Sequence, residues 1–265
     1  MVSKDAVDLV KEAKKAIPSI DEIFRKAIQE TKKFENKYIE NRFSEAVIEL
    51  EAKAFEIFKR YEREAFERLI SSWFKENKRR IEMEIEEALR KSRETNIKPI
   101  EFLKDLIQEI VEETYPIMQY FEKSMGNMRK ARGGRTFELI VRYLLEKLEI
   151  PCERPITAQD RKQFKNVDLL VPDLKTARTK PEQSIFISEK RTLRERWKQS
   201  VPEMKLGYVY LLTIDGNIPA SKAEDMKSEH LIVYVRDELK ELEHLKDLDN
   251  VRRLSDLPKD LARFK

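Results

Sequence analysis

Histidine, cysteine, glycine and long apolar runs are all scarce in this chain of 265 residues, and each scarcity excludes a class of protein. Cys152 is the single cysteine, which excludes a disulfide framework and a cysteine-based zinc site. His230 and His244 are the only histidines, which argues against a multi-histidine metal site and against Ser/His or Cys/His nucleophilic catalysis. Because no run of about 18 apolar residues occurs and the amino-terminal segment lacks a signal-peptide core, we expect a cytoplasmic protein without membrane contact.

A strong excess of one charge is missing as well. The 54 Lys and Arg residues nearly balance the 50 Asp and Glu residues, and the net charge is only +4, unlike the one-sided charge of a disordered tail. Hydrophobic residues make up 40%, enough for a core, while charged residues make up 39%, above the roughly 25% of an average domain. Abundant Lys, Arg and Glu with only five Gly is typical of thermophilic proteins, which is what this composition predicts.

The chain divides into two regions with different sequence patterns. Across residues 1–125 no glycine occurs, and apolar residues recur at three- and four-residue spacing, as in Val47, Leu50, Ala54 and Ile57. This pattern predicts a helical amino-terminal region, used for packing, dimerisation or DNA contact.

Residues 126–265 read as an α/β domain. We expect a basic, glycine-containing loop at 124–135 and an amphipathic helix at 135–150. Short β-type runs follow, and a helix of about ten residues at 192–201 separates the second from the third. The predicted strands are 166–172, 184–190, 207–214 and 230–235. This order of elements predicts helical layers around one sheet.

Three charged residues stand out as a candidate catalytic group: Asp168, Lys190 and Glu203. Asp168 sits in an apolar strand, where a lone carboxylate is costly unless something binds it. If the second strand forms a hairpin with the first, Lys190 converges on Asp168 at one edge, and Glu203 follows one helix later. Two carboxylates suit Mg²⁺, and an ammonium can stabilise the transition state of phosphodiester hydrolysis. On spacing alone, Lys190 and Glu203 can equally be ordinary surface charges.

Neighbouring residues support weaker assignments. Glu189 falls on the strand face opposite Lys190, so we interpret it as a surface charge or as support for the site from outside. The Pro172-Asp173 pair enters a turn, where Asp is common, and Asp168 is therefore the preferred carboxylate. Four basic residues suit phosphate contacts, with a solvated surface as the alternative. These are Arg129, Lys130, Arg132 and Arg135. Trp73 and Phe74 could stack on a flipped base, but their helical spacing favours the core. The core is also the preferred position for Trp197, with base stacking as the alternative.

The run EKRTLRERW at 189–197 carries a family resemblance. An Asp, then Ser-Glu-Lys at 188–190, Arg-Glu-Arg at 194–196 and a Glu thirteen residues after the lysine together resemble type II restriction endonucleases with a PD-(D/E)XK core. The similar branch recognises CC:GG and includes the EcoRII, PspGI and SsoII enzymes. The resemblance covers about residues 130–215, roughly a third of the chain.

This resemblance implies a function and site roles. Asp168 and Glu203 would bind Mg²⁺, with Glu138 as a further acidic ligand from the preceding helix, and Lys190 would complete the catalytic set. Arg194, Glu195 and Arg196 would read G·C pairs, since Arg bonds guanine O6 and N7 and Glu accepts from cytosine N4. The alternative for Glu195 is a capping box with Thr192.

The implied partners are double-stranded DNA, a second copy of the chain in a homodimer or higher oligomer, and a cognate DNA methyltransferase. A palindrome with a CCGG core, or CCNGG or CCWGG, would be cut to leave 5′ overhangs. A structure-specific repair or junction nuclease with the same core, and a non-enzymatic DNA-binding protein, remain alternatives.

Overall fold

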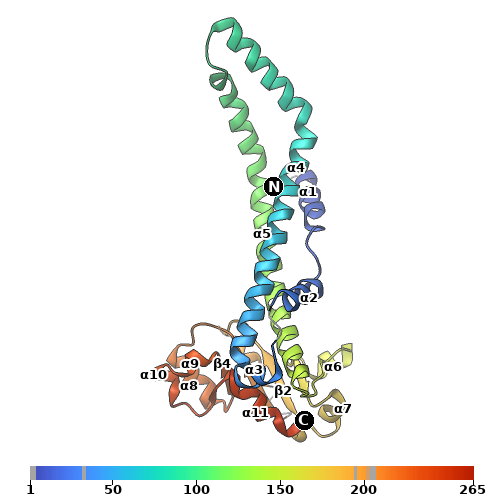
Figure 1. Ribbon diagram of the computed structural model, residues 1–265, viewed down its shortest axis with the longest axis vertical. Coiled ribbons are helices and arrows are strands. Elements are labelled where there is room, and N and C mark those ends of the chain that lie inside the picture. Colours follow the sequence, from blue (N-terminus) through green and yellow to red (C-terminus); the bar gives the residue numbers. More distant parts are fainter. Residues whose placement is uncertain (1–3, 32–33, 194–195, 201, 203–206) are drawn as a thin grey trace. The chain divides into compact units, whose positions relative to one another are not determined.

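The computed structural model describes residues 4–31, 34–193, 196–200, 202 and 207–265. These residues form two compact units (Figure 1). The first unit comprises 1–19 and 56–131, and the second comprises 20–55 and 132–265. The units therefore do not divide at the expected boundary between residues 125 and 126, because the long helices α4 (Phe43–Thr95) and α5 (Pro99–Lys147) each contribute to both.

The first unit is a helical hairpin with α1 (Lys4–Lys14) against it. The outer part of α4 and the first part of α5 pair through buried side chains, with the Phe66 and Phe121 rings 5.6 Å apart. Arg80 bridges the two helices through Glu109 and Glu113, at 2.7 Å to each. The expected helical character of the amino-terminal region is confirmed here, since apolar residues at helical spacing line the hairpin seam.

Segment 124–135 is helical, so the expected basic loop is wrong. Its glycines suggest a break, yet Gly126, Gly133 and Gly134 all lie inside α5. One glycine in a helix interior costs only about 1 kcal/mol relative to Ala. The strong apolar pattern on either side of the segment outweighs that cost and keeps the helix continuous.

The second unit is built on a mixed sheet. Within the described residues the strand order is β1-β2-β3-β4-β5, with β1 antiparallel to β2 and the remaining neighbours parallel. The strands are β1 (Leu169–Val171), β2 (Ile185–Glu189), β3 (Tyr208–Leu212), β4 (Ile232–Val235) and β5 (Val251–Arg253). The four expected strands are confirmed, and β5 is not predicted from the sequence, because two of its three residues are arginines and it shows no apolar run.

Helices cover both faces of this sheet. Alternate strand residues such as Ile185, Ile187 and Leu212 face one apolar core together with the end of α5, whereas Phe186 and Leu211 face a second core. The first core also receives α2 (Ile20–Glu30), α3 (Asn36–Asn41), the base of α4, and α11 (Leu257–Leu261). A parallel sheet needs both faces covered, which explains why the strands read as nearly continuous apolar runs.

In the part of the chain that the structure describes, the second core is closed by five short helices. They are α6 (Ala158–Gln163), α7 (Leu174–Thr179), α8 (Ala220–Ser228), α9 (Asp237–Lys240) and α10 (Glu243–Lys246). Two of them, α6 and α7, begin with a side-chain cap. Asp173 is the N-cap of α7 and accepts a hydrogen bond from the Thr176 amide at 2.7 Å, so the segment after it is a helix and not the expected turn. Short 3-10 turns complete the unit: η1 (Pro181–Gln183), η2 (Arg196–Gln199), η4 (Leu254–Asp256) and η5 (Ala262–Phe264).

The ten-residue helix expected at 192–201 is wrong for the part that the structure describes. Residues 191–193 are not helical, and the described remainder forms only the turn η2. The Leu193 amide donates to the Asp215 carboxylate at 2.9 Å instead of entering a helix. Trp197 is buried in the second core, as expected. No helix among the described residues is long and apolar enough to cross a membrane.

Candidate active site at the β1–β2 edge

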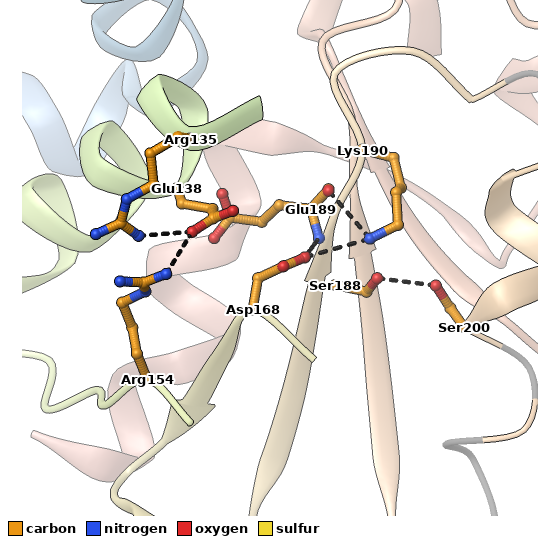
Figure 2. A network of polar contacts seen from close by, with 8 residues as sticks. All are labelled: Arg135, Glu138, Arg154, Asp168, Ser188, Glu189, Lys190 and Ser200. Carbon is orange, nitrogen blue, oxygen red and sulfur yellow. Dashed lines mark hydrogen bonds and ion pairs between the residues drawn. The ribbon is translucent and has the colours of Figure 1, made fainter. Parts of the chain in front are cut away.

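The β1–β2 hairpin brings Asp168 and Lys190 together. Leu169 pairs with Ile187 in the antiparallel register, and the Asp168 amide donates to the Ile187 carbonyl at 2.8 Å. The Asp168 Oδ2 atom then accepts from the Glu189 amide at 2.6 Å and from Lys190 Nζ at 3.3 Å (Figure 2). Alternation along β2 places Lys190 on the side of Asp168, as the sequence predicts.

Burial strengthens this pair. Lys190 is 6% exposed, and its ammonium also donates to the Glu189 carbonyl at 3.2 Å. A charge-assisted bond in such a place is less screened than one at the surface. The Lys190 ammonium is thus held at a defined position beside the Asp168 carboxylate. The Asp168 side chain itself remains 23% exposed to solvent. The alternative of Lys190 as an ordinary surface charge is wrong.

Glu138 lies in the same region on α5, and its carboxylate forms ion pairs with two arginines. Its Oε2 atom accepts from Arg135 Nη1 at 2.7 Å and from Arg154 Nη2 at 2.9 Å (Figure 2). Arg135, expected to contact phosphate, is therefore an ion-pair partner of Glu138. Sequence reasoning did not single out Arg154, because it lies in irregular chain before β1 and matches no motif.

Glu189 is the residue whose expected environment differs most from the structure. It is 7% exposed, and neither carboxylate oxygen has a hydrogen-bond partner. Burial raises the pKa of Glu189 well above its usual value, and the charges of Asp168 and Glu138 raise it further, while Lys190 and Arg154 oppose the shift. The surface interpretation is wrong, because this face of β2 packs on the α5 core.

A buried hydrogen bond joins the hairpin to the segment after η2. The Ser200 hydroxyl donates to the Ser188 hydroxyl at 2.9 Å, and both residues are fully buried. Ser188 occupies the position two residues before the lysine. The expected ligand Glu203 and the expected DNA readers Arg194 and Glu195 lie outside the described residues, and Arg196 is described only as the first backbone position of η2.

A second anchor lies directly after the lysine. Arg191 binds Glu51 of α4 through Nε–Oε1 at 2.7 Å and Nη2–Oε2 at 3.1 Å. Gly133 makes room for this guanidinium, because a Cβ atom there would lie 2.9 Å from Arg191 Nη1. Burial raises the pKa of Glu51, and Arg191 opposes that rise. The chain leaving Lys190 is therefore fixed by an ion pair that sequence reasoning did not find.

The remaining basic residues of α5 differ in their surroundings. Arg129 forms an ion pair with Glu62, with 3.2 Å between Nε and Oε1, and a hydrogen bond with Glu122, so its charge is paired within the helical hairpin. Burial lowers the pKa of Arg132. Lys130 is exposed. A phosphate contact stays a prediction for Lys130 and Arg132.

The carboxylates at this edge suit a divalent cation. In the described part of the chain no group of three or more His, Cys, Asp or Glu side chains is close enough to hold a metal ion. Mg²⁺, however, is commonly held by only one or two carboxylates with water completing the shell. Asp168 and the unpaired, buried Glu189 carboxylate are hard oxygen donors of this kind, so the residues present fit such an ion.

Comparisons with known proteins agree with this architecture. The family model described as EcoRII C terminal matches residues 100–249, more than half of the chain. The type II restriction enzyme SsoII of Shigella sonnei is 26% identical over 208 residues, which is 74% of this chain and 61% of that enzyme. The chain thus spans about three fifths of that relative's length.

Two solved structures share the fold. Metal-depleted Ecl18kI in complex with uncleaved DNA superposes with a TM-score of 0.78 at 19% identity, covering 100% of this chain and 85% of that chain. The restriction endonuclease PspGI in a substrate DNA complex gives 0.65 at 22% identity, covering 95% of each chain. At these identities the likeness shows the fold alone, and the expected PD-(D/E)XK architecture is confirmed.

Proposed function

The chain belongs to the EcoRII C-terminal family, and from this membership we propose that it is a type II restriction endonuclease. Its substrate is double-stranded DNA with a palindrome containing CC:GG, either a CCGG core or CCNGG or CCWGG, and it leaves 5′ overhangs. The observation that carries the proposal is the buried Lys190 ammonium held 3.3 Å from Asp168 at one sheet edge.

Each residue of the site has a proposed role. Asp168 and Glu203 bind Mg²⁺, with Glu138 contributing a further acidic group. Bound there, Mg²⁺ supplies a more acidic water and neutralises charge on the scissile phosphate. The Lys190 ammonium orients the attacking water and stabilises the negative charge that develops on the phosphate oxygens. The hydrogen bonds from Lys190 and the Glu189 amide fix the Asp168 carboxylate before substrate arrives.

Recognition is assigned to the segment that follows the catalytic lysine. Arg194, Glu195 and Arg196 read the CC:GG bases, because Arg and Glu match the guanine and cytosine edges in the major groove. A palindrome calls for a two-fold symmetric reader, so the protein acts as a homodimer or a higher oligomer. A cognate methyltransferase protects the host DNA.

The proposal is tested with purified protein, phage DNA and Mg²⁺ at elevated temperature, followed by sequencing of the fragment ends. Discrete ends that share one CC:GG palindrome support it. Ragged ends would favour a structure-specific nuclease, and no cleavage at all would favour a non-enzymatic DNA-binding protein. Lys190→Ala should abolish cleavage and spare DNA binding, whereas Lys246→Ala, which removes an exposed lysine on α10, should cleave normally.

A further inference from the structure

Lys190 and Asp215 follow two neighbouring parallel strands at the same edge of the sheet. Glu189, the last residue of β2, pairs with Leu212, the last residue of β3, and the Lys190 amide donates to the Leu212 carbonyl at 2.9 Å. The carboxyl ends of adjacent parallel strands meet at one edge, where α/β proteins bind their ligands. Asp215 therefore lies at the edge that carries the catalytic lysine, in a loop to which the proposed function gives no role.

The two oxygens of the Asp215 carboxylate have different partners. Oδ1 accepts from the Asn217 amide at 3.3 Å, which closes a turn within the loop after β3. Oδ2 accepts from the Leu193 amide at 2.9 Å, which joins this loop to the chain that leaves Lys190. The turn needs only the first of these bonds, so the second bond serves the segment at Leu193.

The loop that carries Asp215 is itself held at both ends. The Asp215 amide donates to Thr213 Oγ1 at 3.0 Å. Thr213 is fully buried, and its amide donates to the Tyr234 carbonyl of β4 at 2.9 Å, so it extends the hydrogen bonding of the sheet. Ile218 is buried in the second core, and its carbonyl oxygen lies 2.8 Å from His244 Nε2. The loop can therefore act as a fixed support.

Leu193 directly precedes the triplet at 194–196 that is assigned to base recognition. Its side chain is buried in the second core, as is that of Trp197 directly after the triplet. In the sequence, the residues assigned to DNA contact thus stand between two buried anchors. A binding residue is selective only when the backbone that carries it is held precisely. The Asp215 bond fixes that backbone at the first anchor.

We propose that Asp215 is a positioning residue for DNA recognition, because its carboxylate fixes the backbone at Leu193 and so sets where the triplet begins relative to Lys190. Discrimination between the recognition palindrome and a site with one changed base pair depends on this bond more than the hydrolysis step does. The inference rests on the proposed function, since it takes residues 194–196 as the DNA reader. A neutral oxygen at position 215 can still accept from the Leu193 amide, whereas a methyl group cannot.

The test measures kcat/KM of the full chain on two oligonucleotide duplexes with Mg²⁺. One duplex carries the palindrome found at the fragment ends, the other carries the same site with one G·C pair replaced by A·T, and the ratio of the two values is the discrimination. A good base contact contributes roughly ten- to hundredfold discrimination, so Asp215→Ala should lower the ratio about tenfold. Asp215→Asn should stay within about threefold of wild type, because its amide oxygen still accepts the bond. Asp225→Ala removes an exposed carboxylate on α8 and is the matched control, with the wild-type ratio expected.

A purely structural role of Asp215 would reduce the cleavage of both duplexes by the same factor. An unchanged ratio in Asp215→Ala, or an equal loss in Asp215→Ala and Asp215→Asn, would therefore overturn the inference. Thermal unfolding of the same samples shows whether each variant is folded. If Asp215→Ala does not fold, Asp215→Glu replaces it, because the added methylene displaces the carboxylate while keeping its charge. The ratio should then also fall about tenfold, and an unchanged ratio would have the same negative meaning.

Wild type separates this inference from the proposed function. A high ratio in wild type with an unchanged ratio in Asp215→Ala would leave the proposed function standing and remove Asp215 from recognition. A wild-type ratio near one, or no cleavage of either duplex, would overturn the proposed function and this inference together.

Discussion

Removing Arg191 should destabilise the second unit through the carboxylate that it leaves behind. Arg191 is bonded to Glu51 at 2.7 and 3.1 Å, and the Glu51 side chain is only 10% exposed. Breaking a fully buried pair costs about 3–5 kcal/mol, and an exposed pair contributes about 0–1 kcal/mol. Because the Arg191 side chain is 40% exposed, we expect an intermediate cost of about 2 kcal/mol for Arg191→Ala.

The assay is thermal unfolding of four proteins that form a double-mutant cycle: wild type, Arg191→Ala, Glu51→Gln and the double variant. A cost of about 2 kcal/mol corresponds to a decrease of roughly 4–8 °C in Tm for a unit of this size. The double variant should be more stable than Arg191→Ala, because the neutral amide introduced by Glu51→Gln leaves no unpaired charge. If Arg191→Ala costs the same in the wild-type background and in the Glu51→Gln background, the reasoning is refuted.

The same pair sets a pH dependence. Burial raises the native pKa of Glu51 and Arg191 lowers it, so Arg191→Ala should raise this pKa further. A carboxyl group with a raised native pKa favours the folded state at acid pH, and this contribution is lost as the pH rises through the native pKa. The destabilisation by Arg191→Ala should therefore be smaller at pH 5 than at pH 8. A constant difference between the two Tm values would contradict this.

The packing around single side chains gives three further predictions. Ser200→Ala removes the buried hydrogen bond to Ser188. It should lower kcat about fivefold with little change in KM, since one hydrogen bond contributes about 1 kcal/mol. A rise in KM of about fivefold with unchanged kcat would point to a role in DNA binding instead. Gly207→Ala should lower the Tm, because its Cβ would lie 2.7 Å from both Phe186 Cε2 and the Pro181 carbonyl oxygen. Gly126→Ala should raise the Tm slightly, because Gly126 lies inside α5 with no neighbouring atom of the described residues within 4 Å of the added Cβ. A higher Tm for Gly207→Ala than for Gly126→Ala would contradict the packing. Burial raises the pKa of Cys152 to about 12. Iodoacetamide at pH 8 should therefore modify this thiol about a thousandfold more slowly than the thiol of an unfolded control. Comparable rates would show that the Cys152 thiol is accessible to solvent.

The parts of the fold that could be predicted are those with long, regular patterns. The four apolar strands and the helix ending at Lys147 follow directly from their periodicity. The course of α5 through 126–135 could not be predicted, because glycine is a weak breaker when the flanking turns pack well. Strand β5 could not be predicted either, because its sequence, Val-Arg-Arg, has no apolar run.

The candidate site divides in the same way. Asp168 and Lys190 could be placed because strand alternation and one hairpin are enough to bring them together. The contacts of Arg154, Glu51 and Ser200 could not, since each joins elements whose relative packing no local pattern encodes. The burial of Glu189 could not be predicted either, because strand alternation separates the two faces of β2 without showing that α5 covers the face opposite the lysine.

The central claim is that Asp168 and Lys190 form the catalytic centre of a sequence-specific nuclease. Its most direct test is to sequence the ends of phage DNA fragments after digestion with Mg²⁺ by wild type and by Lys190→Ala. We predict that wild type yields ends sharing one CC:GG palindrome and that Lys190→Ala, still folded and DNA-binding, yields none. The same ends from both proteins would contradict the account.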